Sequence, residues 1–245
     1  MKKMEENIPR GNSLPPGVIS MSKLDICLES LKMRFSSERK DNENIRFVFP
    51  FEYDEYVLLL TQSANTILEK RREKTCFVID SLNESIIEQL YFYLRLNDRF
   101  SGDLRKGIML MGKYGCGKTI IMQAITEMYN TVIYSLHIQR PLLKFFKSSD
   151  LQNILKVKPI GAFSKMPLII DEFGREPKQV MDFGNLRSPM IELLCERYDN
   201  GAWTNGISNF TLDTLCSENQ YGKMTGDRLK SMFNFIELKG DSRRK

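Results

Sequence analysis

The stretch GKYGCGKT, residues 112–119, has a spacing that suits phosphate chemistry: a glycine, four residues, a second glycine, then lysine and threonine. Glycines permit a tight turn whose backbone N–H groups point at one anion, and a following helix adds the positive end of its dipole. Lys118 can reach the β- and γ-phosphates, and the Thr119 hydroxyl can bind Mg²⁺. The stretch therefore predicts a binding loop for a nucleoside triphosphate.

The flanks of this loop agree with that interpretation. An apolar run, GIMLM, precedes it and predicts a buried strand, while KTIIMQAITEMY after it predicts a helix. The residues expected to bind ATP are Gly112, Gly115, Cys116, Gly117, Lys118, Thr119 and Ile120.

Two carboxylates, Asp171 and Glu172, end another apolar run, PLIIDE, 53 residues after Lys118. In open α/β sheets, ligands bind at the carboxyl ends of the strands. We expect Asp171 and Thr119 to hold Mg²⁺, and Glu172 to polarise a water that attacks the γ-phosphate. A glutamate in this role favours ATP hydrolysis over a small-molecule kinase. The alternative interpretation is an acidic pair that ends a strand and caps the next helix.

A third candidate strand ends at Asn209 in GISNFTLDTL. An amide next to the γ-phosphate could position the attacking water. From its sequence context alone, Asn209 is equally well explained as a turn residue.

The motifs LIIDEFG, ERYDNG, SNFTLDTL and YGKMTGDRLKSMFNFIELKGDSRR, in this order after the phosphate loop, resemble the DnaC/IstB-like AAA+ ATPases. These are bacterial and phage helicase loaders and transposition helpers. The resemblance covers roughly residues 105–245 and is most specific from Tyr221 to Arg244. It implies ATP and Mg²⁺ as cofactors.

The resemblance also implies roles by position. Lys118 and Thr119 match Walker A. Asp171 and Glu172 match Walker B, and Asn209 matches sensor 1. Arg228 matches an arginine that reaches the ATP of a neighbouring subunit, so hydrolysis would depend on self-association. Arg243 and Arg244 match a terminal basic pair, to which we assign no role beyond contact with phosphate or DNA.

The remaining patterns predict how these residues are positioned. Residues 1–102 read as a mainly helical region, with a mobile leader at 1–20 and helices from Ser22 to Lys40, from Asp54 and from near Asn83. Residues 103–245 are expected to form an α/β domain, an AAA+ (ASCE) P-loop NTPase with a parallel sheet flanked by helices. Its strands are expected at GIMLM, TVIYSL, PLII and NFIEL, with His137 ending the second. Because five residues follow Gly240, no C-terminal lid domain is expected.

Residues 141–165 hold five lysines and one aspartate, with Phe145, Phe146 and Phe163 between them. The resemblance implies an inserted helix here that lines a channel for single-stranded DNA, which lysines and aromatic rings would suit. The expected DNA contacts are Lys144, Lys147, Lys156 and Lys158. The alternative is an amphipathic helix with its rings in the core.

Composition narrows the class of protein. The chain is 42% hydrophobic and 27% charged, and its net charge of +5 arises after residue 100. No apolar run reaches the ~18 residues of a membrane span, so no membrane partner is expected. Five scattered cysteines without a CxxC pair favour a reduced, cytoplasmic protein.

Three functions are compatible with these observations. The first is an ATP-regulated helicase loader in DNA replication, which binds single-stranded DNA, assembles with ATP and contacts a replicative hexameric helicase through residues 1–102. The second is an IstB-like transposition helper that assembles on duplex DNA. The third, a P-loop metabolic kinase, gives no reason for Glu172 or Arg228.

Overall fold

The computed structural model describes residues 25–30, 32, 46–182 and 185–243. Residues 25–30 and 32 are helical. The rest of the helix expected from Ser22 to Lys40, and the leader expected at 1–20, lie outside the described residues. Within the described ranges, no helix combines the length and hydropathy that crossing a bilayer requires.

A five-stranded parallel sheet lies at the centre of the molecule, which confirms the predicted α/β fold. Its order is β2, β3, β6, β1, β7. The strands are β2 (Lys144–Lys147), β3 (Leu168–Asp171), β6 (Thr204–Ser208), β1 (Gly107–Met111) and β7 (Phe233–Glu237). Because neighbouring strands are parallel, their carboxyl ends meet at one edge.

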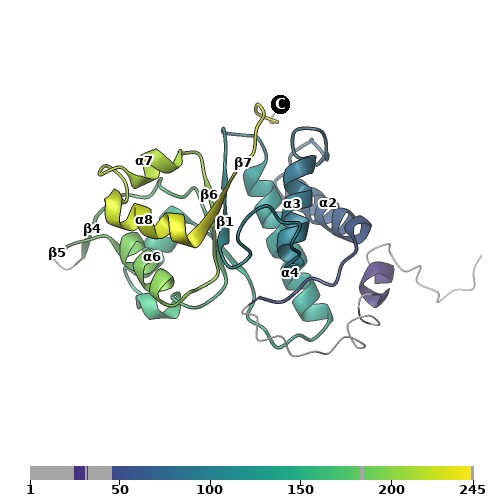
Figure 1. The fold of residues 1–245 in the computed structure, drawn as a ribbon, viewed down its shortest axis with the longest axis horizontal. Helices are drawn as coiled ribbons and strands as arrows, with labels where there is room; N and C mark the ends of the chain where they lie inside the picture. The colour runs from purple at the N-terminus through teal and green to yellow at the C-terminus, as the bar shows by residue number, and fades with distance from the viewer. Residues whose placement is uncertain (1–24, 31, 33–45, 183–184, 244–245) are drawn as a thin grey trace, which may run out of the picture.

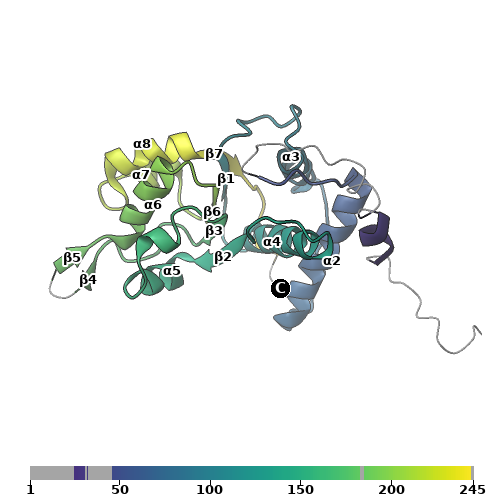
Figure 2. The ribbon, with the colours of Figure 1, turned by 90° about the horizontal axis from the view of Figure 1, so that it is seen from below.

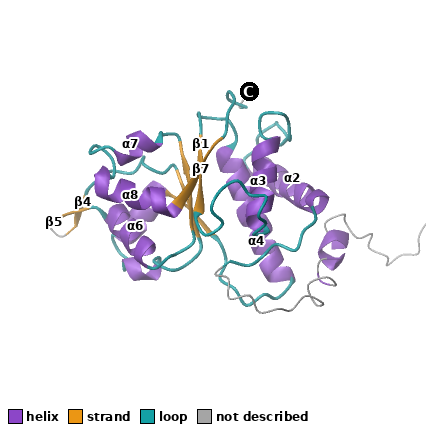
Figure 3. Ribbon diagram, viewed as in Figure 1, coloured by secondary structure: helices purple, strands orange, loops and turns teal. Residues whose placement is uncertain are grey.

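Helices cover both faces of this sheet (Figures 1 and 3). One face carries α2 (Tyr53–Lys70), α3 (Glu84–Leu94) and α4 (Lys118–Ser135). The other carries α5 (Ser148–Leu155), α6 (Pro189–Asp199), α7 (Leu212–Cys216) and α8 (Gly222–Met232), with a 3₁₀ turn at Ile160–Ala162. An antiparallel ribbon of β4 (Val180–Asp182) and β5 (Asn185–Arg187) extends from this second half of the molecule (Figure 2).

Each face of the sheet has its own apolar cluster, and successive strand residues alternate between the two. In β1, Ile108 and Leu110 belong to the cluster under α2–α4, whereas Met109 belongs to the cluster under α5–α8. In β3, Ile169 and Ile170 divide in the same way. Because both faces are buried, these strands are apolar throughout instead of alternating with polar residues.

The described part of the predicted N-terminal region, residues 46–100, packs into the first of these clusters. The rings of Phe49 and Tyr129 of α4 lie 5.4 Å apart. Trp203 donates a hydrogen bond from Nε1 to the hydroxyl of Tyr93 at 2.8 Å. These residues therefore share a core with α4, and the domain boundary near residue 102 stays a prediction.

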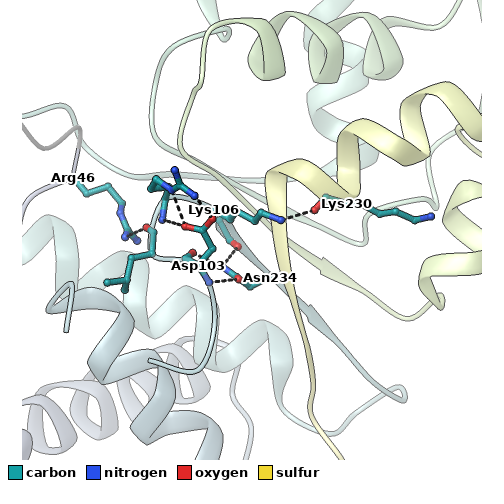
Figure 4. A network of polar contacts seen from close by, with 8 residues as sticks. Arg46, Asp103, Lys106, Lys230 and Asn234 are labelled. Carbon is teal, nitrogen blue, oxygen red and sulfur yellow. Dashed lines mark hydrogen bonds and ion pairs between the residues drawn. The ribbon is translucent and has the colours of Figure 1, made fainter. Parts of the chain in front are cut away.

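The segment that leads into β1 is fixed to β7 and α8 by polar contacts (Figure 4). Asn234 of β7 donates to the carbonyl of Asp103 and accepts from its N–H, both at 2.8 Å. Lys106 donates to the carbonyl of Lys230 at 3.0 Å, and Arg46 donates to a carbonyl of the same segment. These bonds brace the strand that carries the phosphate loop.

The expectation of a strand at TVIYSL is wrong, because these residues continue α4 and then end it. Val132 and Ile133 are buried together with Met128 and Tyr129, at helical spacing. A short run of β-branched residues is compatible with a strand and with the end of a buried helix, and here the longer helical period prevails. His137 follows this helix with φ 51°, and the second strand in the chain is β2.

Candidate nucleotide-binding site

The phosphate loop connects β1 to α4, and three of its glycines have backbone conformations that L side chains rarely adopt. Their φ angles are 145° at Gly112, 79° at Gly115 and 107° at Gly117. At Gly112, an added Cβ would also lie 2.3 Å from the carbonyl oxygen of Leu238. Gly117 is the N-cap of α4, so the free N–H groups of the first turn follow directly after the loop.

Lys118 is buried at 4% exposure and folds back over this loop. Its Nζ donates to the carbonyls of Gly112 and Lys113, both at 2.7 Å, and to Oδ1 of Asn209 at 2.8 Å. Because β6 lies between β1 and β3, Asn209, which follows β6, reaches the loop lysine. The sheet thus joins two predicted site residues that are 91 positions apart.

Thr119 and Asp171 form the next contact, again across the sheet edge. The hydroxyl of Thr119 lies 3.2 Å from both carboxylate oxygens of Asp171. Asp171 is 3% exposed, and its burial raises the pKa of the carboxyl above its ordinary value. A hydroxyl and a desolvated carboxylate are oxygen ligands of the kind that Mg²⁺ takes, so the two residues fit that ion.

Glu172 has φ 56°, a left-handed conformation that is unusual outside glycine. Its carbonyl accepts from the hydroxyl of Ser148 at 2.9 Å. Its carboxylate is paired with Arg175 at 3.2 Å and is 34% exposed. Glu172 therefore lies beside Asp171, with its charge directed to a partner three residues on. Arg175 was not predicted as a site residue.

The last two predicted ATP contacts lie in and after the loop. Cys116 is 2% exposed, and its Sγ is 3.7 Å from Nζ of Lys118. Ile120, in the first turn of α4, is partly buried against the cluster under α2–α4. Their side chains anchor the loop to the core, which leaves backbone groups to contact a ligand.

Arg228 is not brought to the phosphate loop of its own chain. It lies on α8, where its guanidinium is 5.2 Å from the ring centre of Tyr198 and 3.9 Å from the carboxylate of Asp199. Both partners belong to the end of α6. Its side chain is 28% exposed.

The four predicted DNA-contacting lysines are all exposed, but they do not share one helix. Lys144 and Lys147 lie on β2, the edge strand, and Lys156 and Lys158 lie at and after the end of α5. Lys147 is paired in register with Asp171, and its charge offsets a small part of the rise that burial causes in the pKa of that carboxyl. Lys147 therefore lies near the Mg²⁺ residues.

The expected helix in residues 141–165 is present as α5, but the same stretch also contains β2, the edge strand of the central sheet. Phe145 is partly buried against the cluster under α2–α4. Phe146 packs edge-to-face on the buried ring of Phe163, with ring centres 6.0 Å apart. All three rings thus pack against the core, but they lie on β2 and after the 3₁₀ turn and not on one amphipathic helix. The DNA contacts stay a prediction.

The sequence analysis did not predict one ion pair that lies at the loop. Both guanidinium NH groups of Arg243 donate to the carboxylate of Asp80 at 2.8 Å, across 163 positions. Arg243 belongs to the terminal basic pair of the resemblance, but the residues around Asp80 form no recognisable motif, so only the fold shows that the two meet. Arg244 lies outside the described residues.

No protein-family model matches the sequence, and no curated protein matches it significantly. Among solved structures, the chain is similar to DnaI, with 21% identity, 70% of this chain and 88% of that chain covered, and a TM-score of 0.47. The DnaC helicase loader has 20% identity, with 68% of this chain and 95% of that chain covered, and a TM-score of 0.46. AMPPCP-bound DnaA from Aquifex aeolicus has 15% identity, with 67% of this chain and 49% of that chain covered, and a TM-score of 0.45. The structures to which this chain is similar thus include a helicase loader.

Proposed function

We propose that this chain is a Mg²⁺-dependent AAA+ ATPase that loads a replicative helicase onto single-stranded DNA. The observation that supports the ATPase is the meeting of Lys118, Asn209 and the Thr119–Asp171 pair at one sheet edge. These groups come from the ends of three different strands. Such a convergence suits phosphoryl chemistry, which depends on positioning and on neutralising charge.

Each residue has a role in this proposal. Lys118 exchanges the loop carbonyls for phosphate oxygens, and Asn209 orients the attacking water. Thr119 and Asp171 would hold Mg²⁺, which supplies positive charge to the phosphates when bound. Glu172 leaves Arg175 and accepts the proton of the water.

Arg228 acts in trans in this proposal. Its side chain is partly exposed on α8, and its 3.9 Å contact with Asp199 is a weak restraint. An arginine so placed is available to the ATP of a neighbouring copy. Self-association with ATP would then complete the site.

The loading role rests on the motif resemblance. Residues 1–102 bind the helicase, and the nucleotide state changes the affinity for DNA and helicase. The same motifs serve a transposition helper that assembles on duplex DNA, which is the second candidate function.

Anisotropy of labelled single-stranded and duplex oligonucleotides, with ATP and with ADP, tests the proposal. Lys118→Ala, which removes the ammonium from the loop, is the control for nucleotide dependence. ATP-dependent binding of single strands supports the loader, whereas ATP-dependent binding of duplex transfers the proposal to the transposition helper. An active ATPase that binds neither would contradict both DNA roles.

A further inference from the structure

After β7, the chain crosses the phosphate loop and stays in contact with it. Leu238 donates its N–H to the carbonyl of Met111 at 2.7 Å, and Arg243 donates its N–H to the carbonyl of Gly115 at 3.0 Å. An added Cβ at Gly115 would lie 2.3 Å from the hydroxyl of Ser242. The C-terminal segment 238–243 is therefore built against the loop.

The side chain of Arg243 lies at the end of the loop where α4 begins. Its Cδ is 3.8 Å from the position of a Cβ added at Gly117, the N-cap of α4. Both terminal nitrogens are bound by Asp80, in a two-pronged pair of 2.8 Å bonds. This pairing holds the pKa of the Asp80 carboxyl below its ordinary value.

Asp80 is fixed by a closed turn ahead of α3. Its N–H donates to Oδ1 of Asn83 at 2.9 Å, and its Oδ1 accepts from the N–H of Leu82 at 3.0 Å. Asn83 is 2% exposed and also donates to the carbonyl of Val78 at 3.0 Å. The position of the carboxylate is therefore fixed. When the ion pair breaks, the side chain of Arg243 is the partner that moves.

A guanidinium binds phosphate with the same two-pronged geometry as carboxylate. The side chain of Arg243 is long enough to reach the N-terminus of α4, where the phosphates of the proposed nucleotide would bind. While Asp80 accepts one bond from each terminal nitrogen, this two-pronged face of the guanidinium is not available to a phosphate. The two anions therefore compete for one cation.

We propose that Asp80 is a positioning residue of the nucleotide site, which holds Arg243 beside the phosphate loop and competes with the bound triphosphate for its guanidinium. The inference rests on the proposed ATP binding. Binding of a triphosphate in the loop weakens the Asp80–Arg243 pair. The stability of the segment at residues 77–83 therefore depends on the nucleotide state. That segment joins α2 to α3, in the region assigned to the helicase.

The test measures ATP and ADP affinity of the full chain by fluorescence titration, in wild type, Asp80→Asn, Arg243→Gln and the double variant. Asp98→Asn is the matched control, because Asp98 is an exposed aspartate on a turn after α3. Since the pair is partly exposed, Asp80→Asn is expected to tighten ATP binding about three- to five-fold. The gain should be smaller for ADP and absent when residue 243 is glutamine.

Unchanged or weaker ATP binding by Asp80→Asn, with normal binding by wild type, overturns the inference and leaves the proposed function intact. Failure of wild type to bind ATP overturns both. Hydrogen exchange of the wild type gives an answer that does not depend on any variant. Amides at residues 77–83 are expected to exchange faster with ATP than with ADP, and equal exchange contradicts the coupling.

Discussion

Single residues at the site fall into two groups, those that already touch one another and those held by other partners. Lys118 is hydrogen-bonded to Asn209, and Thr119 is hydrogen-bonded to Asp171. Glu172 is adjacent to them in sequence, but its carboxylate is paired with Arg175. In the proposed function, the first group would position the nucleotide, and Glu172 would have to leave Arg175 before it could act.

Glu172→Gln should keep ATP binding and lose hydrolysis. The amide cannot accept a proton from water, and a general base contributes about 10²- to 10⁴-fold. Phosphate release and nucleotide titration on the same protein measure the two effects. Glu127→Gln, at an exposed glutamate of α4, is the control. A variant at 172 that hydrolyses at the wild-type rate would exclude the assigned role.

Asp171→Asn should raise the free energy of unfolding at neutral pH while it abolishes hydrolysis. Burial raises the pKa of Asp171, so the folded state binds its proton more tightly than the unfolded state does. Above the pKa of the folded state, the buried charge lowers the free energy of unfolding. This loss is relieved as the pH falls through that pKa. Urea unfolding at about pH 7 and about pH 5 should show the variant's advantage shrinking at the lower pH. An advantage that grows on acidification would contradict this sign.

Elements place these groups through strand order and through buried polar contacts between layers. Arg197 of α6 is 0% exposed and donates to Oγ1 of Thr204 at 2.9 Å and to the carbonyls of Trp203 and Phe163. Its burial lowers its pKa to about 9. This one side chain ties α6 to β6 and to the turn before β3, and so fixes the strand that precedes Asn209.

Arg197→Met should destabilise the fold by at least about 3 kcal/mol, because it removes three hydrogen bonds from a charged donor and leaves the buried carbonyl of Phe163 without one. Arg99→Met is the control, since Arg99 is exposed and only covers the ring of Phe92. Its loss should cost less than about 1 kcal/mol. Denaturant unfolding compares the two, and equal losses would contradict a structural role for Arg197.

Arg228→Ala should lower assembly-dependent hydrolysis about 10³- to 10⁵-fold with little change in ATP affinity. Mixing this variant with Glu172→Gln should restore part of the activity. In the mixed assembly, some interfaces combine an intact Glu172 with an intact Arg228. If mixing restores nothing, Arg228 does not act in trans.

At the scale of the whole molecule, the sheet separates two halves that share the nucleotide site at its edge. One half contains α2–α4 and Asp80, and the other contains α8 with Arg228 and the exposed lysines after α5. A nucleotide at this edge would touch structures on both sides. This arrangement suits a switch that couples one partner on each side to the state of the nucleotide.

Lys156→Glu with Lys158→Glu should weaken binding of single-stranded DNA and reduce its salt dependence. If each lysine neutralises one phosphate, the slope of log affinity against log salt should fall by about 1.4. The control is Lys70→Glu with Lys74→Glu, on and just after α2. Titrations at several salt concentrations measure the slope. DNA affinity that both pairs leave untouched would remove the lysines after α5 from the interface.

The sequence predicted the phosphate loop, the Asp171–Glu172 pair and the parallel sheet because their signals are local. Gly112, Gly115 and Gly117 are required by backbone conformation, and buried parallel strands are continuous apolar runs. The strand predicted at TVIYSL was wrong because a short run of mostly apolar and β-branched residues suits a strand and a helix end equally. In residues 141–165 a helix could be predicted, but not that Phe145 and Phe146 pack into different clusters, because that depends on β2 being a strand of the sheet.

By itself, then, the sequence identified the residues that we propose to bind phosphate and metal, since that chemistry belongs to side chains and glycines a few positions apart. Only the tertiary structure decided their partners. The pairing of Lys118 with Asn209 depends on β6 lying between β1 and β3, and Asp80 meets Arg243 across 163 positions. Contacts of this kind depend on how the layers pack, and no local pattern of residues specifies that.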